Sequence, residues 1–353
     1  MIFLFSQRLV IQNKQKKLYF CIVVLCMTAM AALRYGQGAD YYGYKYLYHI
    51  DYYPHVDLVN KEPGYVFCSF MLNRLGVPYQ VFIALLAIFE MSCFCRFIDK
   101  YSPYRILGLL LLYPTLYLTY IYSAFRQAVA IAIFCGFLVQ FLVEKKWWQY
   151  FVGLAIAACF HKTVLVMIVL PLVCKIKYKQ LCRMVPLAIF GGILLCLIDV
   201  AVPLEFILQD RAVVYVETWG NRDISIMGMA ERTLLAGFVL WNTLKYEAED
   251  GDTIITLSKI YVIGYMLSAL MVRYSMMSSR LGVYCKALDL VLIPMLLHRM
   301  KPKRRWLVTA IILLHSFVFL YKNIASYIGY GGYEGRNVWN YPYISIFNTE
   351  VFE

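Results

Sequence analysis

Long apolar stretches, separated by short polar segments, recur along almost the whole chain. Stretches near 20 residues match the roughly 30 Å hydrocarbon core of a bilayer. Apolar helices in the cores of soluble proteins rarely follow one another in this way. The pattern therefore predicts an all-α fold, a polytopic transmembrane helix bundle with about 10–12 membrane segments. The stretches are residues 18–34, 78–98, 104–123, 125–143, 148–160, 163–174, 184–199, 231–246, 255–275, 282–298 and 306–322, with a further short helix over 64–76.

The stretches 148–160 and 163–174 are predicted to be two separate short helices. Lys and Arg gather in the cytoplasmic loops of membrane proteins, and here they fall on one side only if the chain turns back between these two stretches. Each stretch then covers only about 20 Å, so we expect a tilted or re-entrant pair that meets near His161 and Lys162. The basic segments on this side are the N-terminus and residues 96–105, 145–146, 175–183 and 299–305.

This topology predicts a single integral membrane domain over residues 1–353, with a cytoplasmic N-terminus and no soluble domain. Three long segments then lie on the outer face. They are the loop 35–62, the loop 200–230 and the tail 323–353. Any chemistry must use these segments or polar groups inside the bundle.

The composition agrees with a membrane protein and excludes several other classes. Of the 353 residues, 62% are hydrophobic, which is more than one soluble core of this size can bury. Much of the net charge of +13 lies in short loops between apolar stretches, and no nucleic-acid-binding motif accompanies it. The eleven cysteines form no CxxC pair and lie mostly in apolar stretches, so we expect neither disulfides nor a metal site. Without Walker A, GxGxxG, GxSxG or HExxH motifs, we expect no cofactor.

Tyrosines crowd the first outer loop, and two interpretations of them stay open. Tyrosine suits the membrane interface, because its ring is apolar and its hydroxyl is wet. Tyrosine rings can also stack on sugar rings while neighbouring carboxylates bind sugar hydroxyls. The carboxylates of this loop are Asp40, Asp51, Asp57 and Glu62.

Two polar positions in apolar surroundings are candidates for chemistry. Arg126 and Gln127 open a predicted helix at its outer end, and His161 lies at the break of the short-helix pair. Arg126 either snorkels to the lipid headgroups or clamps phosphate, since a guanidinium matches phosphate oxygens. His161 either packs between helices or takes a proton from a sugar hydroxyl as a base.

Further charges lie near the end of the chain. Arg273 and Arg280 fall at the outer ends of predicted helices. Lys286 and Asp289 are three residues apart, so we expect them on one helix face in a structural role. Glu90 is a buried acid, either their partner or a pathway residue.

Several short segments follow one another in an order that resembles the EpsG family, which is grouped with the Wzy-type bacterial polysaccharide polymerases. The resemblance runs from about residue 35 to the tail. Lys162 departs from it, because a small or hydroxyl residue is expected there. The matching positions are Asp40, Tyr41, Glu62, Pro63, Gly64, Tyr65, Arg126, Gln127, Phe160, His161, Arg280, Trp339, Pro342 and Tyr343.

The resemblance implies a membrane glycosyltransferase at the outer face of the bacterial inner membrane. A growing glycan would leave undecaprenyl pyrophosphate and join the next lipid-linked repeat unit, building O-antigen, capsule or exopolysaccharide. The expected partners are the undecaprenyl-pyrophosphate-linked glycan, membrane lipid, a flippase and a chain-length regulator. The catalytic candidates are His161, Arg126, Arg280 and Asp40. The substrate-binding candidates are Gln127, Tyr41, Tyr44, Glu62, Tyr65, Arg211, Arg222, Arg273, Trp339 and Tyr343.

Other membrane functions stay open. A flippase or exporter of the lipid-linked unit would line a cavity at midplane depth with basic residues, whereas these arginines fall mostly at the outer ends of the stretches. An acyltransferase would place its histidine toward the cytoplasm. A glycan ligase shares the lipid pyrophosphate donor and differs only in its acceptor, and a non-catalytic scaffold would leave the arginines without a purpose.

Overall fold

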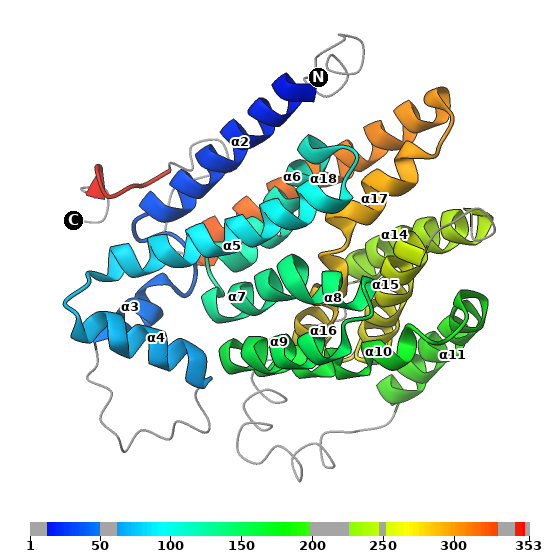
Figure 1. Ribbon diagram of the computed structural model, residues 1–353, viewed down its shortest axis with the longest axis horizontal. Helices are drawn as coiled ribbons and strands as arrows, with labels where there is room; N and C mark the ends of the chain where they lie inside the picture. The colour runs from blue at the N-terminus through cyan, green and yellow to red at the C-terminus, as the bar shows by residue number, and fades with distance from the viewer. Residues whose placement is uncertain (1–12, 50–61, 198–225, 247–251, 331–342, 350–353) are drawn as a thin grey trace. The chain divides into compact units, whose positions relative to one another are not determined.

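The computed structural model describes residues 13–49, 62–197, 226–246, 252–330 and 343–349 (Figure 1). Within these ranges the regular structure is helical, apart from one isolated bridge between Arg34 and Ser345. Six of the described helices are long and apolar enough to cross a bilayer, and shorter apolar helices accompany them. The prediction of an all-α polytopic membrane protein is confirmed.

The helices of the first half of the chain are α2 (Asn13–Leu33), α3 (Tyr41–His49), α4 (Pro63–Arg74), α5 (Tyr79–Tyr101), α6 (Arg105–Leu112), the π-helix η1 (Tyr113–Ile121), α7 (Phe125–Ile133), the π-helix η2 (Phe134–Leu138), α8 (Val139–Val143), α9 (Trp147–Phe160), the 3-10 helix η3 (Lys162–Val169) and α10 (Leu170–Val173). Those of the second half are α11 (Tyr178–Leu197), α14 (Ile226–Tyr246), α15 (Asp252–Leu270), α16 (Ser275–Lys286), α17 (Asp289–His298) and α18 (Pro302–Tyr330).

Prolines set both ends of α5. Pro78 precedes the helix in an extended conformation, with its ring fixing φ at −62°. At the other end, Ser102 is extended at φ −88° and ψ 120°, because the ring of Pro103 disfavours a helical conformation in the residue before it. The 23 apolar-rich residues between them are long enough to span a bilayer.

The chain divides into two compact units. Unit 1 consists of residues 1–137, 155–162 and 289–353, and unit 2 of residues 138–154 and 163–288. The sequence led us to expect one membrane domain. Each unit is described by itself below.

In unit 1, α5 packs against both α2 and α7, and the chain end returns to α2. The amide of Tyr35 donates to the carbonyl of Ile344 at 3.0 Å, and the amide of Ile346 donates to that of Leu33 at 3.0 Å. The hydroxyl of Tyr343 donates to the carbonyl of Met30 at 2.9 Å. The predicted tail therefore joins the end of the first membrane helix.

In unit 2, α15 packs against α11, α14 and α16 (Figure 1). Glycines permit the close approaches. A Cβ atom built on Gly192 would lie 2.1 Å from the carbonyl oxygen of Ala269, and one on Gly264 would lie 2.0 Å from the Cβ of Cys285. Small residues commonly let membrane helices approach in this way.

The predicted break of the short-helix pair is confirmed. The α-helix α9 ends at Phe160, His161 lies outside regular structure, and the 3-10 helix η3 begins at Lys162. The predicted helix over 64–76 also exists, as α4.

Other expectations need correction. Lys286 and Asp289 do not lie on one helix, because α16 ends at Lys286 and α17 begins at Asp289. Lys286 instead lies 3.3 Å from a carboxylate oxygen of Glu231 on α14. Apolar residues continue past 322, and α18 accordingly extends to Tyr330.

The segments predicted as outer loops also hold helical structure. α3 lies within 35–62, and the first turns of α14 occupy 226–230. Residues 50–61 and 200–225 lie outside the described residues.

Candidate functional site

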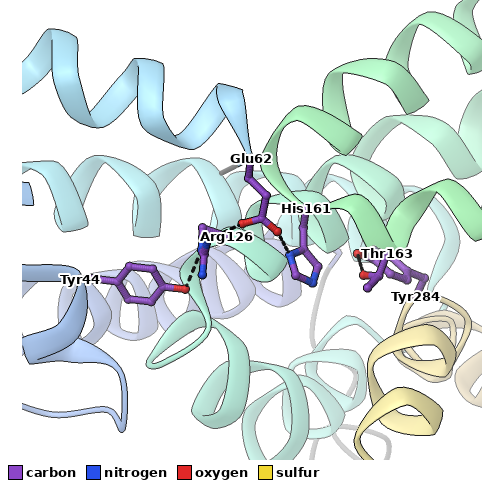
Figure 2. A network of polar contacts seen from close by, with 6 residues as sticks. All are labelled: Tyr44, Glu62, Arg126, His161, Thr163 and Tyr284. Atoms are coloured by element: carbon purple, nitrogen blue, oxygen red, sulfur yellow. Dashed lines mark hydrogen bonds and ion pairs between the residues drawn. The ribbon is translucent and has the colours of Figure 1, made fainter. Parts of the chain in front are cut away.

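A carboxylate in unit 1 lies between two of the residues singled out from the sequence. One oxygen of Glu62 forms an ion pair with Nη1 of Arg126 at 2.7 Å. The other oxygen contacts Nδ1 of His161. Nε of Arg126 also donates a hydrogen bond to the hydroxyl of Tyr44 at 3.2 Å. Figure 2 shows these four side chains in a row, with Glu62 between Arg126 and His161.

Local sequence around Glu62 fixes this carboxylate beside α9. Glu62 precedes α4, and its carbonyl accepts the amide of Tyr65 at 3.1 Å. Pro63 fits the first turn of the helix, because that position needs no amide donor. A Cβ on Gly64 would lie 3.0 Å from the Cβ and 3.1 Å from the carbonyl oxygen of Cys159. The missing side chain at Gly64 thus lets the start of α4 approach the end of α9, two residues before His161.

Arg126 is the second residue of α7, and a buried arginine supports the turn before it. Arg34 is 1% exposed and donates to the carbonyl of Ile121 at 3.0 Å and to that of Ala31. Its guanidinium carbon lies 4.8 Å from the ring centre of Tyr122 and 4.9 Å from that of Phe125. Cations interact favourably with aromatic faces at such distances. Arg34 therefore ties the end of η1 to the start of α7.

The segment that leads into α3 also touches this turn. The amide of Asp40 donates to Oγ of Ser123 at 3.2 Å. Gly38 adopts φ +109°, and a Cβ there would lie 2.0 Å from the carbonyl oxygen of Tyr122. A side chain at position 38 is excluded both by this conformation and by the lack of space. The side chain of Asp40 itself is exposed.

The tyrosines of α3 divide into two faces. Tyr41, Tyr44 and Tyr48 recur at helical spacing and are buried, whereas Tyr42 and Tyr46 are 49% and 70% exposed. The buried face is aromatic core, in which Tyr44 stacks on Phe125 at a centroid distance of 4.8 Å.

The buried tyrosines have perturbed pKa values. Burial raises the pKa of Tyr44 above its ordinary value and that of Tyr41 to about 12. Both hydroxyls are therefore neutral at physiological pH. Tyr44 can accept the hydrogen bond from Arg126 without carrying a charge, and Tyr41 donates to a side-chain oxygen of Gln80 at 3.2 Å.

The rings of Tyr44 and Tyr65 lie on the guanidinium of Arg126. Their centroids are 5.4 and 6.0 Å from its central carbon. The Arg126 side chain nevertheless keeps 36% of its surface exposed, while Glu62 keeps 11%. Arg126 is thus positioned by its neighbours and accessible from one side, as a phosphate-binding group must be.

The contact with Glu62 determines which nitrogen of His161 faces the carboxylate. An ionised carboxylate can only accept hydrogen bonds, so Nδ1–H donates the hydrogen bond to Glu62. In the neutral imidazole, Nε2 then carries the lone pair. Nε2 is covered and has no hydrogen-bond partner among the described residues. Buried polar atoms normally have partners. A lone pair held in this way resembles the arrangement in which a carboxylate orients a histidine as general base.

The remaining candidates lie elsewhere. Gln127 is 3% exposed, and Tyr343 is 37% exposed. Within unit 2, Arg273 donates to the carbonyl of Cys196 at 3.2 Å, and Arg280 is half-buried. Arg211, Arg222 and Trp339 lie outside the described residues. The structure thus brings together His161, Arg126, Glu62, Tyr44 and Tyr65.

Unit 2 has polar contacts of its own. Nη1 of Arg232 donates to Oγ of Ser278 at 3.0 Å. The hydroxyls of Thr163 and Tyr284 are 2.9 Å apart (Figure 2). In the ranges that the structure describes, no group of three or more His, Cys, Asp and Glu side chains could hold a metal ion.

Sequence reasoning missed Arg34 and did not foresee that Glu62 links the other two groups. Arg34 ends the first predicted apolar stretch, 18–34, and was not singled out. Its lack of a carboxylate nearby in the sequence was the available signal, because such a charge must find carbonyls or rings when it is buried.

Comparison with known proteins gives one match. No curated protein and no solved structure matches the chain. The model of the EpsG family matches residues 17–344, a range that includes every described residue of the Glu62 cluster. Because this match covers nearly the whole chain, the protein belongs to the EpsG family, which is related to the Wzy-like polysaccharide polymerases.

Proposed function

We propose that this protein polymerises undecaprenyl-pyrophosphate-linked oligosaccharides into a surface polysaccharide at the outer face of the bacterial inner membrane. Family membership supports a polysaccharide polymerase in general terms. The observation that carries the finer proposal is the cluster of Glu62, Arg126 and His161, which puts a phosphate-binding cation and an oriented base on either side of one carboxylate.

The reaction transfers a glycan from its lipid pyrophosphate to a sugar hydroxyl. His161 removes the hydroxyl proton through Nε2, and the oxygen forms a bond to the anomeric carbon of the donor glycan. The bond between that carbon and the phosphate oxygen breaks, and undecaprenyl pyrophosphate leaves with the electron pair. The leaving group supplies the driving force, so ATP is not needed.

Arg126 stabilises the charge that develops on the leaving pyrophosphate. Fixed cations aimed at developing charge are among the largest contributions to catalysis. Two N–H groups of Arg126 serve Tyr44 and Glu62, and its guanidinium has five in all. The N–H groups on its exposed side can bind a phosphate oxygen.

The exposed face of α3 is suited to hold sugar. Tyr42 and Tyr46 are four residues apart and both exposed. Their rings can stack on the apolar face of a sugar, while the buried tyrosines of the same helix keep α3 in place. The glycan would approach Arg126 along this helix.

The proposed orientation follows from the basic loops. With a cytoplasmic N-terminus, α2 crosses to the outer face and ends there at Leu33. Arg34 and the turn before Arg126 then lie at the outer end of unit 1. A flippase that delivers the lipid-linked unit and a chain-length regulator are the proposed accessory partners.

The test is glycan length in cells that carry Arg126→Ala or His161→Ala in place of the wild-type protein. Arg304→Ala and His315→Ala serve as matched controls, since both residues lie in α18 and outside the cluster. Membrane insertion is checked by fractionation and immunoblotting.

Loss of long chains, with single repeat units at the outer face, is the expected result for both site variants and for neither control. Full-length polymer from both site variants would overturn the proposal. Units trapped on the cytoplasmic side would indicate a flippase instead, and long chains that stay on lipid would indicate a ligase.

A further inference from the structure

We propose that Glu62 couples the two halves of the site, so that an anion bound by Arg126 strengthens the interaction of Glu62 with His161 and makes His161 the stronger base. The inference rests on the proposed function and deepens it. Glu62 acts in it as a positioning residue, which touches neither the sugar nor the phosphate.

The geometry places one carboxylate between two competing partners. One oxygen of Glu62 serves Arg126 at 2.7 Å, and the other serves His161. The side chains of Glu62 and His161 keep only 11% and 13% of their surface exposed. Arg126 keeps 36%, so an anion that enters the site reaches the guanidinium before it reaches the other two.

A bound anion and Glu62 compete for the guanidinium of Arg126, and this competition changes the electrostatic environment of Glu62. In the empty site, the cation of Arg126 compensates the carboxylate. A bound phosphate forms charge-assisted hydrogen bonds with the same guanidinium and takes over part of that compensation. Arg126 then compensates less of the negative charge of Glu62. A protonated His161 imidazole stabilises that charge better than a neutral imidazole does.

A stronger partner raises the affinity of His161 for a proton. An opposite charge nearby favours the charged form of a titratable group, so the His161 midpoint is expected to rise when pyrophosphate binds. His161 therefore takes the acceptor's proton most readily once the donor pyrophosphate is in place. Without a donor, it remains a weaker base toward water.

Among the described residues, the other titratable groups considered near His161 and Arg126 are two tyrosines, an aspartate and a lysine. Tyr44 faces Arg126 from α3 and is kept neutral by its raised pKa, and Tyr65 faces Arg126 from α4. The carboxylate of Asp40 is exposed and screened by water. Lys162 follows His161 and is exposed, so water screens its charge.

The experiment is a histidine titration by NMR on the full-length protein in detergent. His161 is assigned by the signal that disappears in His161→Gln, and its midpoint is measured with and without inorganic pyrophosphate. Glu62→Gln removes the charge and keeps the size of the side chain. Glu62→Asp retains the charge and serves as the second variant. Pyrophosphate binding is measured separately in each.

The expected result is a pyrophosphate-induced rise of the His161 midpoint in the wild type, a smaller rise in Glu62→Asp and none in Glu62→Gln, although Glu62→Gln still binds pyrophosphate. An equal rise in Glu62→Gln would overturn the coupling, since the anion would then act on His161 directly. A constant midpoint in the wild type, with or without binding, would overturn it as well.

Kinetics separate this inference from the proposed function. Glu62→Gln should lower kcat at least about tenfold, with little change in KM for the lipid-linked donor, because general-base catalysis contributes about 10²–10⁴-fold. Activity that needs Arg126 and His161 but is equal in Glu62→Gln would overturn the inference and leave the polymerase proposal standing. A Glu62-dependent shift of the His161 midpoint in a protein that makes no polymer would overturn the polymerase proposal and leave the coupling by Glu62 standing.

Discussion

Replacement of Arg34 with Met is expected to loosen the turn that presents Arg126 without touching Arg126 itself. Arg34 is 1% exposed and has contacts at both ends of its reach, with the carbonyls of Ala31 and Ile121. Methionine has a similar length and can fill the volume. It has no donor for either carbonyl and no charge for the flanking rings.

The magnitude can be worked from these contacts. Each charge-assisted hydrogen bond contributes about 1.5–3 kcal/mol, and each cation–π contact, here at 4.8 and 4.9 Å, about 1 kcal/mol. The desolvation of a guanidinium with no carboxylate partner among the described residues offsets several kcal/mol of this. We expect a net loss of roughly 2–4 kcal/mol, concentrated at Ile121 to Phe125.

The assay combines thermal unfolding in detergent with hydrogen exchange of peptides that cover residues 119–127. Arg34→Met should unfold at a lower temperature and exchange faster in those peptides, and polymer length should fall because Arg126 is no longer held. Arg304→Met is the matched control, since Arg304 is exposed in the same unit. Unchanged exchange at 119–127 in Arg34→Met would show that Arg34 does not hold this turn.

Three further predictions follow from contacts in the two units. Gly64→Ala should lower the free energy of unfolding by about 1–3 kcal/mol and shorten the polymer, because its Cβ would meet Cys159 at 3.0 Å and displace Glu62. Thermal unfolding and a glycan gel measure the two effects, and full-length polymer would contradict the prediction. Lys286→Met should destabilise by about 3 kcal/mol by removing the cation that lies 3.3 Å from Glu231, and Glu231→Gln should restore most of that loss in the double variant, as a double-mutant cycle would measure. Burial raises the pKa of Tyr41 from 10 to about 12, so the contribution of Tyr41 to the free energy of unfolding is fully present below pH 10 and is lost as the pH rises through 12. Unfolding temperatures between pH 9 and 12 should therefore fall more steeply for the wild type than for Tyr41→Phe. Parallel curves would contradict this.

The fold class could be predicted from the sequence because hydrophobic length is a local property. An apolar stretch such as 78–98 predicts a membrane span from its own sequence alone, and α5 runs from Tyr79 to Tyr101. The break at His161 could also be predicted, since the positive charges fit one side only with a turn there. The end of α16 at Lys286 and the start of α17 at Asp289 could not be predicted, because nothing between them breaks a helix locally.

The sequence predicted which residues belong to the candidate site, but not the contacts between them. Arg126 and His161 were singled out as polar groups in apolar surroundings, a signal that needs only the sequence nearby. Glu62 was expected to bind sugar, and its place between them depends on a contact of Gly64 with Cys159, 95 positions along the chain. The buried role of Tyr41 and Tyr44 likewise depends on which face of α3 meets α5 and α7, which periodicity alone does not reveal.

The return of the chain end to the first membrane helix has a consequence for biogenesis. Residues 344 and 346 hydrogen-bond to Tyr35 and Leu33, so the support beside Arg34 forms only after residue 346 has left the ribosome. Unit 1 is also interrupted twice by unit 2 in the sequence. The insertion machinery must therefore deliver all of the second unit before the first can close. A nascent chain stalled before residue 343 would lack the hydrogen bonds of residues 344 and 346 to the end of α2.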